Sequence, residues 1–371
     1  MYLHKNRLEP NPICMESKFS QTFGFASIGI GNIYSLGFIS LMVILSQLVS
    51  GCTSKEKVST NEKYVIQAFD SIEVYSRHSL TFNLDSLETQ VLKQVFASSS
   101  HKEVIELLEY AVQTIDKHNY ILSPEKYHQM ETGTNPEVLV NPYPFQYEIL
   151  ENKYAFLSLE GFIGVDSISS KNYSDSLQRS ILYLYHQQPK GWIIDLRNNS
   201  GGWIYPMLAG LGPILGSGTK AFEMSGNQVL EEYYFYKDST DYLLLADSIW
   251  FFEEQLPLAV LVSEKTGSAG ELLTLSFRGN PNTTIIGTPT AGFSTGLKGF
   301  LMPDGTQICV TNGIMVDRNK KGDGGRIIPD IIEWDPLLMF EQAFKWIEKN
   351  TDSKLRKPAG INRKKPRRLT E

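Results

Sequence analysis

The chain has 371 residues, of which 42% are hydrophobic and 20% charged, and its formal net charge is −6. This length and composition predict a globular protein with room for one large and one small domain, and they exclude a fibrous or disordered chain. A chain with a negative net charge has no overall positive electrostatic potential to attract nucleic acid, so no nucleic-acid partner is expected. The cysteines, Cys14, Cys52 and Cys309, are too few and too scattered for a disulfide framework or a zinc site, and we expect neither metal nor cofactor.

Residues 1–52 have the features of an export signal. Basic residues precede a mostly apolar run from Phe23 to Val49, which ends in Val49-Ser50-Gly51-Cys52. A basic start, an apolar middle and small residues before a break are typical of a secretory signal. The last four residues resemble the bacterial lipobox, whose cysteine receives the lipid. We therefore predict a bacterial cell-envelope protein, periplasmic or otherwise extracytoplasmic, held to the membrane by lipid on Cys52.

Two details of this segment stay open. The apolar run approaches the length that spans a bilayer, so a membrane-spanning anchor is the alternative to a lipobox. Both interpretations place the rest of the chain outside the cytoplasm. Because a long polar stretch precedes Phe23, Met15 is a second candidate for the start of the protein.

Residues 53–130 are predicted to form a small helical amino-terminal domain. Apolar residues recur there at helical spacing, as in Val104, Leu107, Leu108, Ala111, Val112 and Ile115. A stretch with proline, asparagine and glycine follows, and we interpret residues 131–150 as a linker.

Residues 151–350 alternate between strand and helix patterns. Strands are expected at Tyr154–Leu159, Trp192–Leu196, Leu258–Val262 and Thr284–Gly287, and helices at Ser174–His186, Tyr205–Leu215 and Ala269–Phe277. This alternation predicts a layered α/β domain with a largely parallel sheet. A hairpin around Pro303-Asp304-Gly305 is expected to extend that sheet, and a helix from Pro336 to Lys349, capped by Asp335, closes the domain.

The end of the chain, 351–371, is rich in lysine and arginine and poor in apolar residues. Such a composition buries too little surface to offset the entropy of ordering, so we predict a disordered basic tail. A solvated tail is favoured over one that binds nucleic acid or anionic lipid.

The first motif with chemical meaning follows the strand Gly191–Leu196. It continues Arg197-Asn198-Asn199-Ser200-Gly201-Gly202 into a helix. Paired glycines between a strand and a helix let backbone amides face a ligand, as in an oxyanion hole or a phosphate site. A phosphate site is disfavoured because neither Gly-Lys-Ser/Thr nor G-x-G-x-x-G is present. A glycine turn without a catalytic task is the alternative.

The second motif follows the strand Leu258–Val262. Gly267-Ser268-Ala269-Gly270 opens a helix there, and this places the Ser268 hydroxyl beside free helix-terminal amides. Such a serine can act as a nucleophile, although an ordinary N-cap serine gives the same pattern. The α/β-hydrolase elbow G-x-S-x-G is excluded, because Thr266 replaces its first glycine.

Three runs, DLRNNSGG, SEKTGSAGELL and IIGTPTAG, together resemble the tail-specific, or C-terminal-processing, serine protease family, also called serine peptidase family 41. The resemblance covers about Tyr154 to Trp334. It implies a layered crotonase/ClpP-like core and peptide substrates. It also implies that Ser268 is the nucleophile and that the amides of Gly201, Gly202 and Ala269 form the oxyanion hole.

The base that activates the serine is not the one used by the better-known branch of this family. That branch has a lysine within Thr-x-Gly-Lys-Gly, where this chain has Phe293. Instead, the segment around His118 resembles the Asp-Lys-His-Ser-Tyr/Phe segment of the nisin-resistance-protein branch, although Asn119 stands where serine is usual. Members of that branch use a His–Ser pair and carry a helical amino-terminal domain but no PDZ domain. The resemblance therefore implies His118 as the base.

A third residue that orients the imidazole would be a carboxylate or a similar acceptor, and Asp317 is the first candidate and Asp323 the second, although a site of two residues would also suffice. The resulting hypothesis is a secreted, lipid-anchored serine endopeptidase or carboxy-terminal peptidase that works through an acyl-enzyme. The main alternative is a non-catalytic peptide-binding lipoprotein that retains the protease fold. A crotonase-like acyl-CoA enzyme is a weaker alternative, because export from the cytoplasm argues against coenzyme A as a ligand.

Overall fold

A computed structural model describes residues 59–96, 98–132, 134, 143–164, 166–235, 246, 249–252, 255–280, 282–351 and 361–364. Thr60–Glu371 forms one compact unit, separate from Met1–Ser59. The predicted signal segment and Cys52 lie outside the described residues. Within the described residues, no helix combines the length and the apolar character that a membrane span requires.

The first sheet contains six strands in the order β12-β9-β8-β4-β3-β2. Their bounds are β2 (Phe145–Leu150), β3 (Tyr154–Leu159), β4 (Gly191–Asp195), β8 (Leu258–Val262), β9 (Thr283–Gly287) and β12 (Ile331–Ile332). All neighbouring pairs are parallel except β2 with β3. Every residue of β4 and β8 is buried, as expected for central parallel strands covered on both faces.

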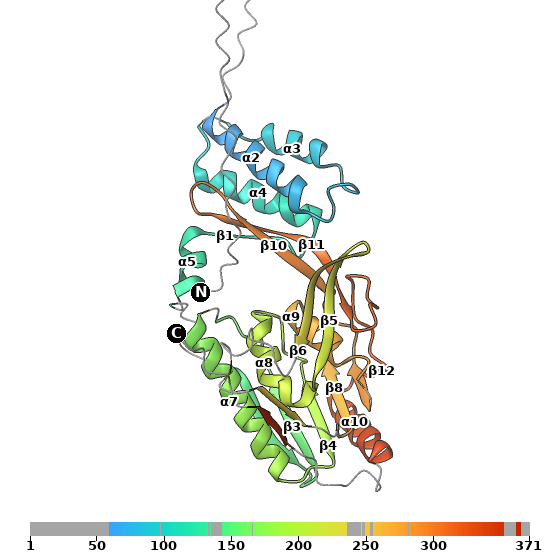
Figure 1. Ribbon diagram of the computed structural model, residues 1–371. Helices are drawn as coiled ribbons and strands as arrows, with labels where there is room; N and C mark the ends of the chain where they lie inside the picture. Colours follow the sequence, from blue (N-terminus) through green and yellow to red (C-terminus); the bar gives the residue numbers. More distant parts are fainter. Residues whose placement is uncertain are drawn as a thin grey trace, which may run out of the picture. The chain divides into compact units, whose positions relative to one another are not determined.

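Helices cover both faces of this sheet (Figure 1). One face shares a core with α7 (Ser167–His186), α8 (Ile204–Leu215) and α9 (Ala269–Phe277). The other face packs against α10 (Pro336–Asn350). The start of α10 follows the sequence prediction: Pro336 stands in the first turn, and the Asp335 carboxylate accepts the amides of Leu337 and Leu338.

A second, antiparallel sheet contains β1 (Tyr120–Leu122), β5 (Gly218–Ser225), β6 (Gln228–Phe235), β10 (Thr295–Leu301) and β11 (Gln307–Asp317). The hairpin predicted around Pro303-Asp304-Gly305 is therefore present as β10 and β11, but it does not extend the parallel sheet. It pairs instead with β1 and β5, because β11 offers one edge to those two strands and the other to β10. Strands β5 and β6 were not predicted from the sequence.

The amino-terminal helices pack on this second sheet. They are α2 (Thr60–Tyr75), α3 (Leu84–Leu92) and α4 (His101–Ile115), and α5 (Pro124–Thr132) follows β1. Buried side chains of α2, α3 and α4 share one apolar core with Met302, Ile308 and Val310 of the β10–β11 hairpin. The helices and the hairpin therefore stabilise one another.

Two expected boundaries need correction. The predicted linker, 131–150, contains the whole of β2, which pairs with β3 over its full length. The predicted disordered tail contains β13 (Ile361–Lys364), which pairs antiparallel with β7 (Ile249–Phe252). The backbone hydrogen bonds of β13 do not depend on apolar side chains, which explains why composition alone failed to predict this strand.

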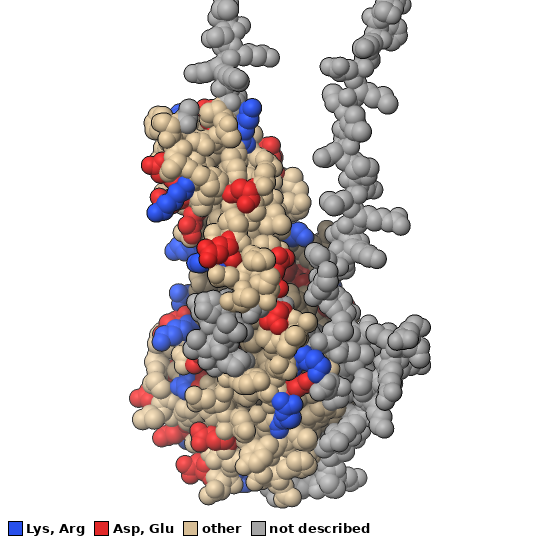
Figure 2. Space-filling model, turned by 90° about the vertical axis from the view of Figure 1, so that its left-hand side faces the viewer, with Lys and Arg blue, Asp and Glu red and all other residues tan. Residues whose placement is uncertain are grey.

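Charged side chains are interspersed on the face of the molecule that Figure 2 shows, with acidic and basic residues side by side among uncharged ones. This mixture agrees with the modest net charge of the chain. The more distinctive arrangements of polar groups lie at the ends of the parallel strands.

Candidate active site

Ser268 lies in the turn between β8 and α9 and has an unusual backbone conformation. Its φ is +50° and its ψ is −118°, in a region that L-residues other than glycine seldom adopt. Such a conformation costs on the order of 1–3 kcal/mol and persists only where surrounding contacts impose it.

Glu271 supplies the contacts that hold this turn. Its carboxylate is fully buried and accepts the amides of Ser268 at 3.0 Å, Gly292 at 2.9 Å and Phe293 at 2.7 Å, together with the hydroxyl of Thr290. Burial raises the pKa of Glu271, and the four donors oppose that rise. One buried carboxylate thus joins the serine turn to the loop before β10.

His118 meets Ser268 although the two are 150 residues apart in the sequence. Its Nε2 lies 3.1 Å from the Ser268 Oγ. His118 occupies the junction between α4 and β1, and β1 pairs with β11 of the second sheet. The structure therefore brings together the two residues that the sequence analysis singled out as nucleophile and base.

The residues on either side of His118 fix its backbone. The Asp116 carboxylate accepts the His118 amide at 2.9 Å and also contacts His78 Nε2. Asn119, 1% exposed, donates from its side chain to the Val112 carbonyl and accepts the amide of Thr311. The asparagine that departs from the family pattern thus ties the histidine loop to both α4 and β11.

The second ring nitrogen of His118 contacts a threonine. Nδ1 lies 2.7 Å from the Oγ1 of Thr295, the first residue of β10, which is 3% exposed. This corrects the prediction that Asp317, or else Asp323, orients the imidazole. Asp317 accepts the amides of Asn319 and Lys321 and closes the turn after β11, and Asp323 accepts the amide of Gly325.

Phe293 stacks on the imidazole of His118. The ring centroids are 5.1 Å apart and the planes differ by 24°. The position that holds lysine in the better-known branch therefore carries a flat apolar surface that supports the histidine. An offset stack of this kind restricts the orientation of the imidazole ring.

Burial lowers the pKa of His118 to about 4, and the nearby Asp116 carboxylate opposes this shift only in part. The imidazole is therefore neutral near pH 7. If Nδ1 carries the proton and donates it to Thr295, Nε2 has a free lone pair facing the serine hydroxyl. This arrangement can take a proton from Ser268.

The three amides predicted for an oxyanion hole are not equivalent. The Gly201 amide already donates to the Asn199 Oδ1 at 3.1 Å, which corrects its predicted role. The amides of Gly202 and Ala269 donate to no acceptor within the described part of the chain. These two remain able to hold an oxyanion.

Gly201 instead permits close approach of the two motifs. Its φ is +123°, and a Cβ added there would lie 2.9 Å from the Ser268 Cβ. Asn199 strengthens the same junction, because its carbonyl accepts the Gly267 amide at 3.0 Å.

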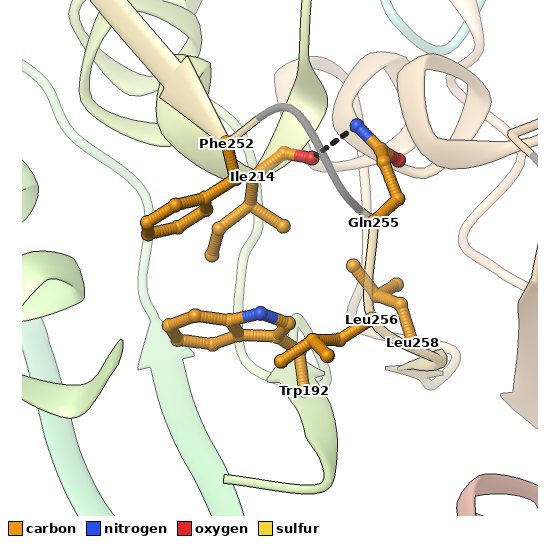
Figure 3. A pocket seen from close by; sticks show the side chains of 6 residues that line it. All are labelled: Trp192, Ile214, Phe252, Gln255, Leu256 and Leu258. Atoms are coloured by element: carbon orange, nitrogen blue, oxygen red, sulfur yellow. Dashed lines mark hydrogen bonds between the residues drawn. The ribbon is translucent and has the colours of Figure 1, made fainter. Parts of the chain in front are cut away.

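Figure 3 shows a small cavity that is lined mostly by apolar side chains. It has a volume of about 10 Å³ and is lined by side chains that include Trp192 and Leu258, at the amino-terminal ends of β4 and β8. Ser268 follows the opposite end of β8. A cavity of this size holds about one water molecule and is too small for a peptide side chain.

Across the described ranges, no group of His, Cys, Asp or Glu has the arrangement of a metal site.

Sequence reasoning missed three contributors to this site. Glu271 had a readable signal, because glutamate three residues after a serine that starts a helix is a capping pattern. Asn199 lies within the first motif, but no role was predicted for its side chain. Thr295 had no local signal, since a threonine at the start of a strand is common.

Sequence comparisons relate this chain to known peptidases. The profile of Peptidase family S41 matches residues 154–332. The nisin-resistance protein of Lactococcus lactis subsp. lactis is 25% identical over 283 residues, which are 73% of this chain and 82% of that protein. A carboxyl-terminal-processing protease of Picosynechococcus sp. is 26% identical over 210 residues, but the match spans only 45% of that protein.

Solved structures show the same fold. A lipoprotein from Streptococcus agalactiae superposes with a TM-score of 0.66 at 26% identity, covering 78% of this chain and 96% of that one. The photosystem II D1 C-terminal processing protease has a TM-score of 0.53 at 13% identity, covering 75% and 94%. The mixed α/β fold is thus that of S41 proteases, and the chain carries a Peptidase family S41 domain, homologous to nisin-resistance protein and to carboxyl-terminal-processing proteases.

Proposed function

We propose that this protein is a serine peptidase in which Ser268 is the nucleophile and His118 the general base. The observation that carries the proposal is the 3.1 Å contact between His118 Nε2 and Ser268 Oγ. We also infer a layered crotonase/ClpP-like core, supported by the helices α8 and α9 that share apolar contacts with both sheets.

In the proposed mechanism, His118 Nε2 takes the Ser268 proton as Oγ attacks the carbonyl carbon of a peptide bond. The amides of Gly202 and Ala269 stabilise the oxyanion of the tetrahedral intermediate. When the intermediate collapses, the imidazolium returns the proton to the leaving amine, and an acyl-enzyme remains. Water then attacks the acyl group with His118 again as base and restores the serine. Throughout the reaction, Thr295 Oγ1 accepts a hydrogen bond from the Nδ1–H group and so keeps Nε2 directed at the serine.

The substrate is proposed to be a peptide or an unfolded protein segment. Membership of a peptidase family supports the hydrolysis of peptides. One relative is named for resistance to nisin, so antimicrobial peptides of that kind are reasonable test substrates. The cleavage position, internal or near the carboxyl terminus, is a property of side-chain contacts rather than of the fold.

The test of this proposal is labelling by a fluorophosphonate, which reacts with activated serines. We expect the purified chain to be labelled and Ser268→Ala to be inert. We expect His118→Gln to be labelled at least about a hundredfold more slowly, because it lacks the base. His186→Gln is a control, since His186 is exposed near the end of α7.

Labelling that survives Ser268→Ala would contradict the assignment. Absence of labelling, combined with tight binding of an uncleaved peptide, would favour the peptide-binding lipoprotein instead.

We further propose that the protein is a lipoprotein of the bacterial envelope, anchored through Cys52 and facing away from the cytoplasm. Support comes from the Val49-Ser50-Gly51-Cys52 sequence and from similarity to a streptococcal lipoprotein. In cells that express the full chain, radioactive palmitate should label the wild type but not Cys52→Ala. Equal labelling of both would contradict lipid attachment at this cysteine.

A further inference from the structure

Glu223 of β5 is a buried carboxylate placed over a pair of glycines. It is 7% exposed, and its side chain crosses β11 to reach β10. Gly296 of β10 and Gly313 of β11 face each other there. A Cβ at 296 would lie 1.9 Å from the Glu223 carboxyl carbon, and one at 313 would lie 2.9 Å from Oε1. The carboxylate therefore occupies space that any other residue at these positions would fill.

This carboxylate has too few partners for its burial. Its hydrogen-bond partner is the hydroxyl of Tyr233, 3.4 Å from Oε2, and that hydroxyl also lies 3.3 Å from a carboxylate oxygen of Glu231. A hydroxyl has one proton, so it cannot donate to both acceptors at once. Among the described lysines and arginines, none forms an ion pair with Glu223.

The burial of the Glu223 carboxylate is reflected in its pKa. Burial raises the pKa of Glu223 to about 7, and the Tyr233 hydroxyl opposes this only in part. A buried carboxylate without a cationic or fully hydrogen-bonded environment is costly, and side chains of this kind are enriched at functional sites. A cation brought to Glu223 would supply the missing partner.

Glu223 is connected to both sides of the candidate active site. On one side, the Gly296 that it covers directly follows Thr295, which contacts His118. On the other side, the Tyr233 ring lies 6.0 Å from Tyr205, and the Tyr205 ring lies 5.1 Å from Trp203. Trp203 follows Gly202, whose amide is open to an oxyanion.

We propose that Glu223 recognises a cationic side chain, lysine or arginine, of the peptide substrate next to the scissile bond. The proposal rests on the peptidase function proposed above and names the substrate class of that same site. Tyr205 and Trp203 are placed to contact the aliphatic stem or the charge of such a side chain, and Trp203 is 37% exposed.

The test compares substrates that differ only in charge. Phosphonate probes that carry a lysine-like side chain, or its uncharged isostere norleucine, report the residue that supplies the carbonyl group. A peptide library with mass-spectrometric readout reports the residue on the amine side. We expect the wild type to prefer the cationic form at one of these positions by about tenfold or more in labelling rate or kcat/KM.

Glu223→Gln should bring that preference below about twofold, because the variant loses the charge that distinguishes the cationic from the neutral substrate. Glu223→Asp keeps the charge and should retain part of the preference. Glu232→Gln is the matched control, because Glu232 lies on the neighbouring strand β6 but is exposed, and it should keep the full preference.

Two results would overturn the inference. One is equal reaction of the wild type with charged and neutral substrates. The other is an equal loss for both substrates in Glu223→Gln with a normal thermal unfolding curve, which would indicate a purely structural role. Fluorophosphonate labelling separates the two proposals: a labelled wild type without cationic preference refutes the role of Glu223 alone, whereas an unlabelled wild type refutes the peptidase function.

Discussion

The imidazole of His118 is held by two uncharged neighbours, the hydroxyl of Thr295 and the ring of Phe293. Neither of them is the carboxylate that was expected to orient the ring. A threonine oxygen can accept a hydrogen bond from Nδ1–H and so favour the tautomer with the proton on Nδ1. It does not stabilise the imidazolium as a carboxylate does. Thr295 therefore orients the ring, while burial keeps the pKa of His118 low.

The burial of His118 predicts how the proposed reaction depends on pH. The base must be neutral to accept a proton, and burial lowers the pKa of His118 to about 4. Activity should therefore be present above that value and fall as the pH drops through about 4. The measurement is kcat/KM, or the fluorophosphonate labelling rate, from pH 3.5 to 8, with tryptophan fluorescence as a control for unfolding. An acid limb near the ordinary histidine value of about 6.5 would contradict the structure.

Removal of the threonine hydroxyl tests the orienting contact. Thr295→Val keeps the size of the side chain but leaves Nδ1 without its acceptor, so we expect kcat to fall about tenfold or more with little change in KM. Thr284→Val is the control, since Thr284 is also buried but lies in β9. An unchanged kcat in Thr295→Val would show that this contact is dispensable.

At the scale of elements, the β8–α9 turn combines a strained serine with a buried carboxylate that holds it. The Glu271 carboxylate receives donors both from this turn and from the loop before β10. The turn and the loop that carries Phe293 therefore behave as one unit. The position of the stacked imidazole depends on that unit even though Glu271 does not touch it.

Glu271→Gln should break this unit. A glutamine amide nitrogen cannot accept a hydrogen bond, so at least one backbone amide would lose its acceptor, at a cost of about 1–3 kcal/mol in the free energy of unfolding. Chemical denaturation measures that change, and fluorophosphonate labelling should slow in parallel. Glu264→Gln is the control, because Glu264 is an exposed glutamate close to the same turn. Equal stability of the two variants would contradict the proposed role of the carboxylate.

At the scale of the whole described unit, the amino-terminal helices help to position His118. They share an apolar core with the β10–β11 hairpin, and His118 lies in the short connection between α4 and β1. The contact between His118, the proposed base, and Ser268 therefore depends on helix packing at a distance from the serine.

Leu108→Ala tests this dependence. Leu108 is fully buried in α4, and its truncation should lower the free energy of unfolding by about 2–5 kcal/mol. Because the helices and the sheet share one core, we expect loss of helix signal and loss of activity at the same denaturant concentration. Tyr110→Ala, at a 68% exposed position of the same helix, should change stability little. Unfolding of the helices with retained activity would contradict the shared core.

The sequence by itself determined the features that depend on local patterns. Buried strands followed by Gly201-Gly202 and by Ser268 predicted the two turns of the site, and the alternation of strands and helices predicted the parallel sheet. The family resemblance added His118, which no local pattern could connect to the serine. The strand and turn predictions succeeded because a strand–turn–helix unit is encoded within a few neighbouring residues. The catalytic roles of Ser268 and His118 stay predictions.

Tertiary structure alone decided which groups complete the site. Thr295 meets His118 across 177 residues of sequence, and Asn199 occupies the Gly201 amide that seemed available from the motif. The second sheet and the carboxylate of Glu223 over two glycines follow from strand pairing, which the sequence does not display. The physical reason is that hydrogen-bond partners and desolvation depend on which distant segments pack together, whereas periodicity reports only which face of each segment is buried.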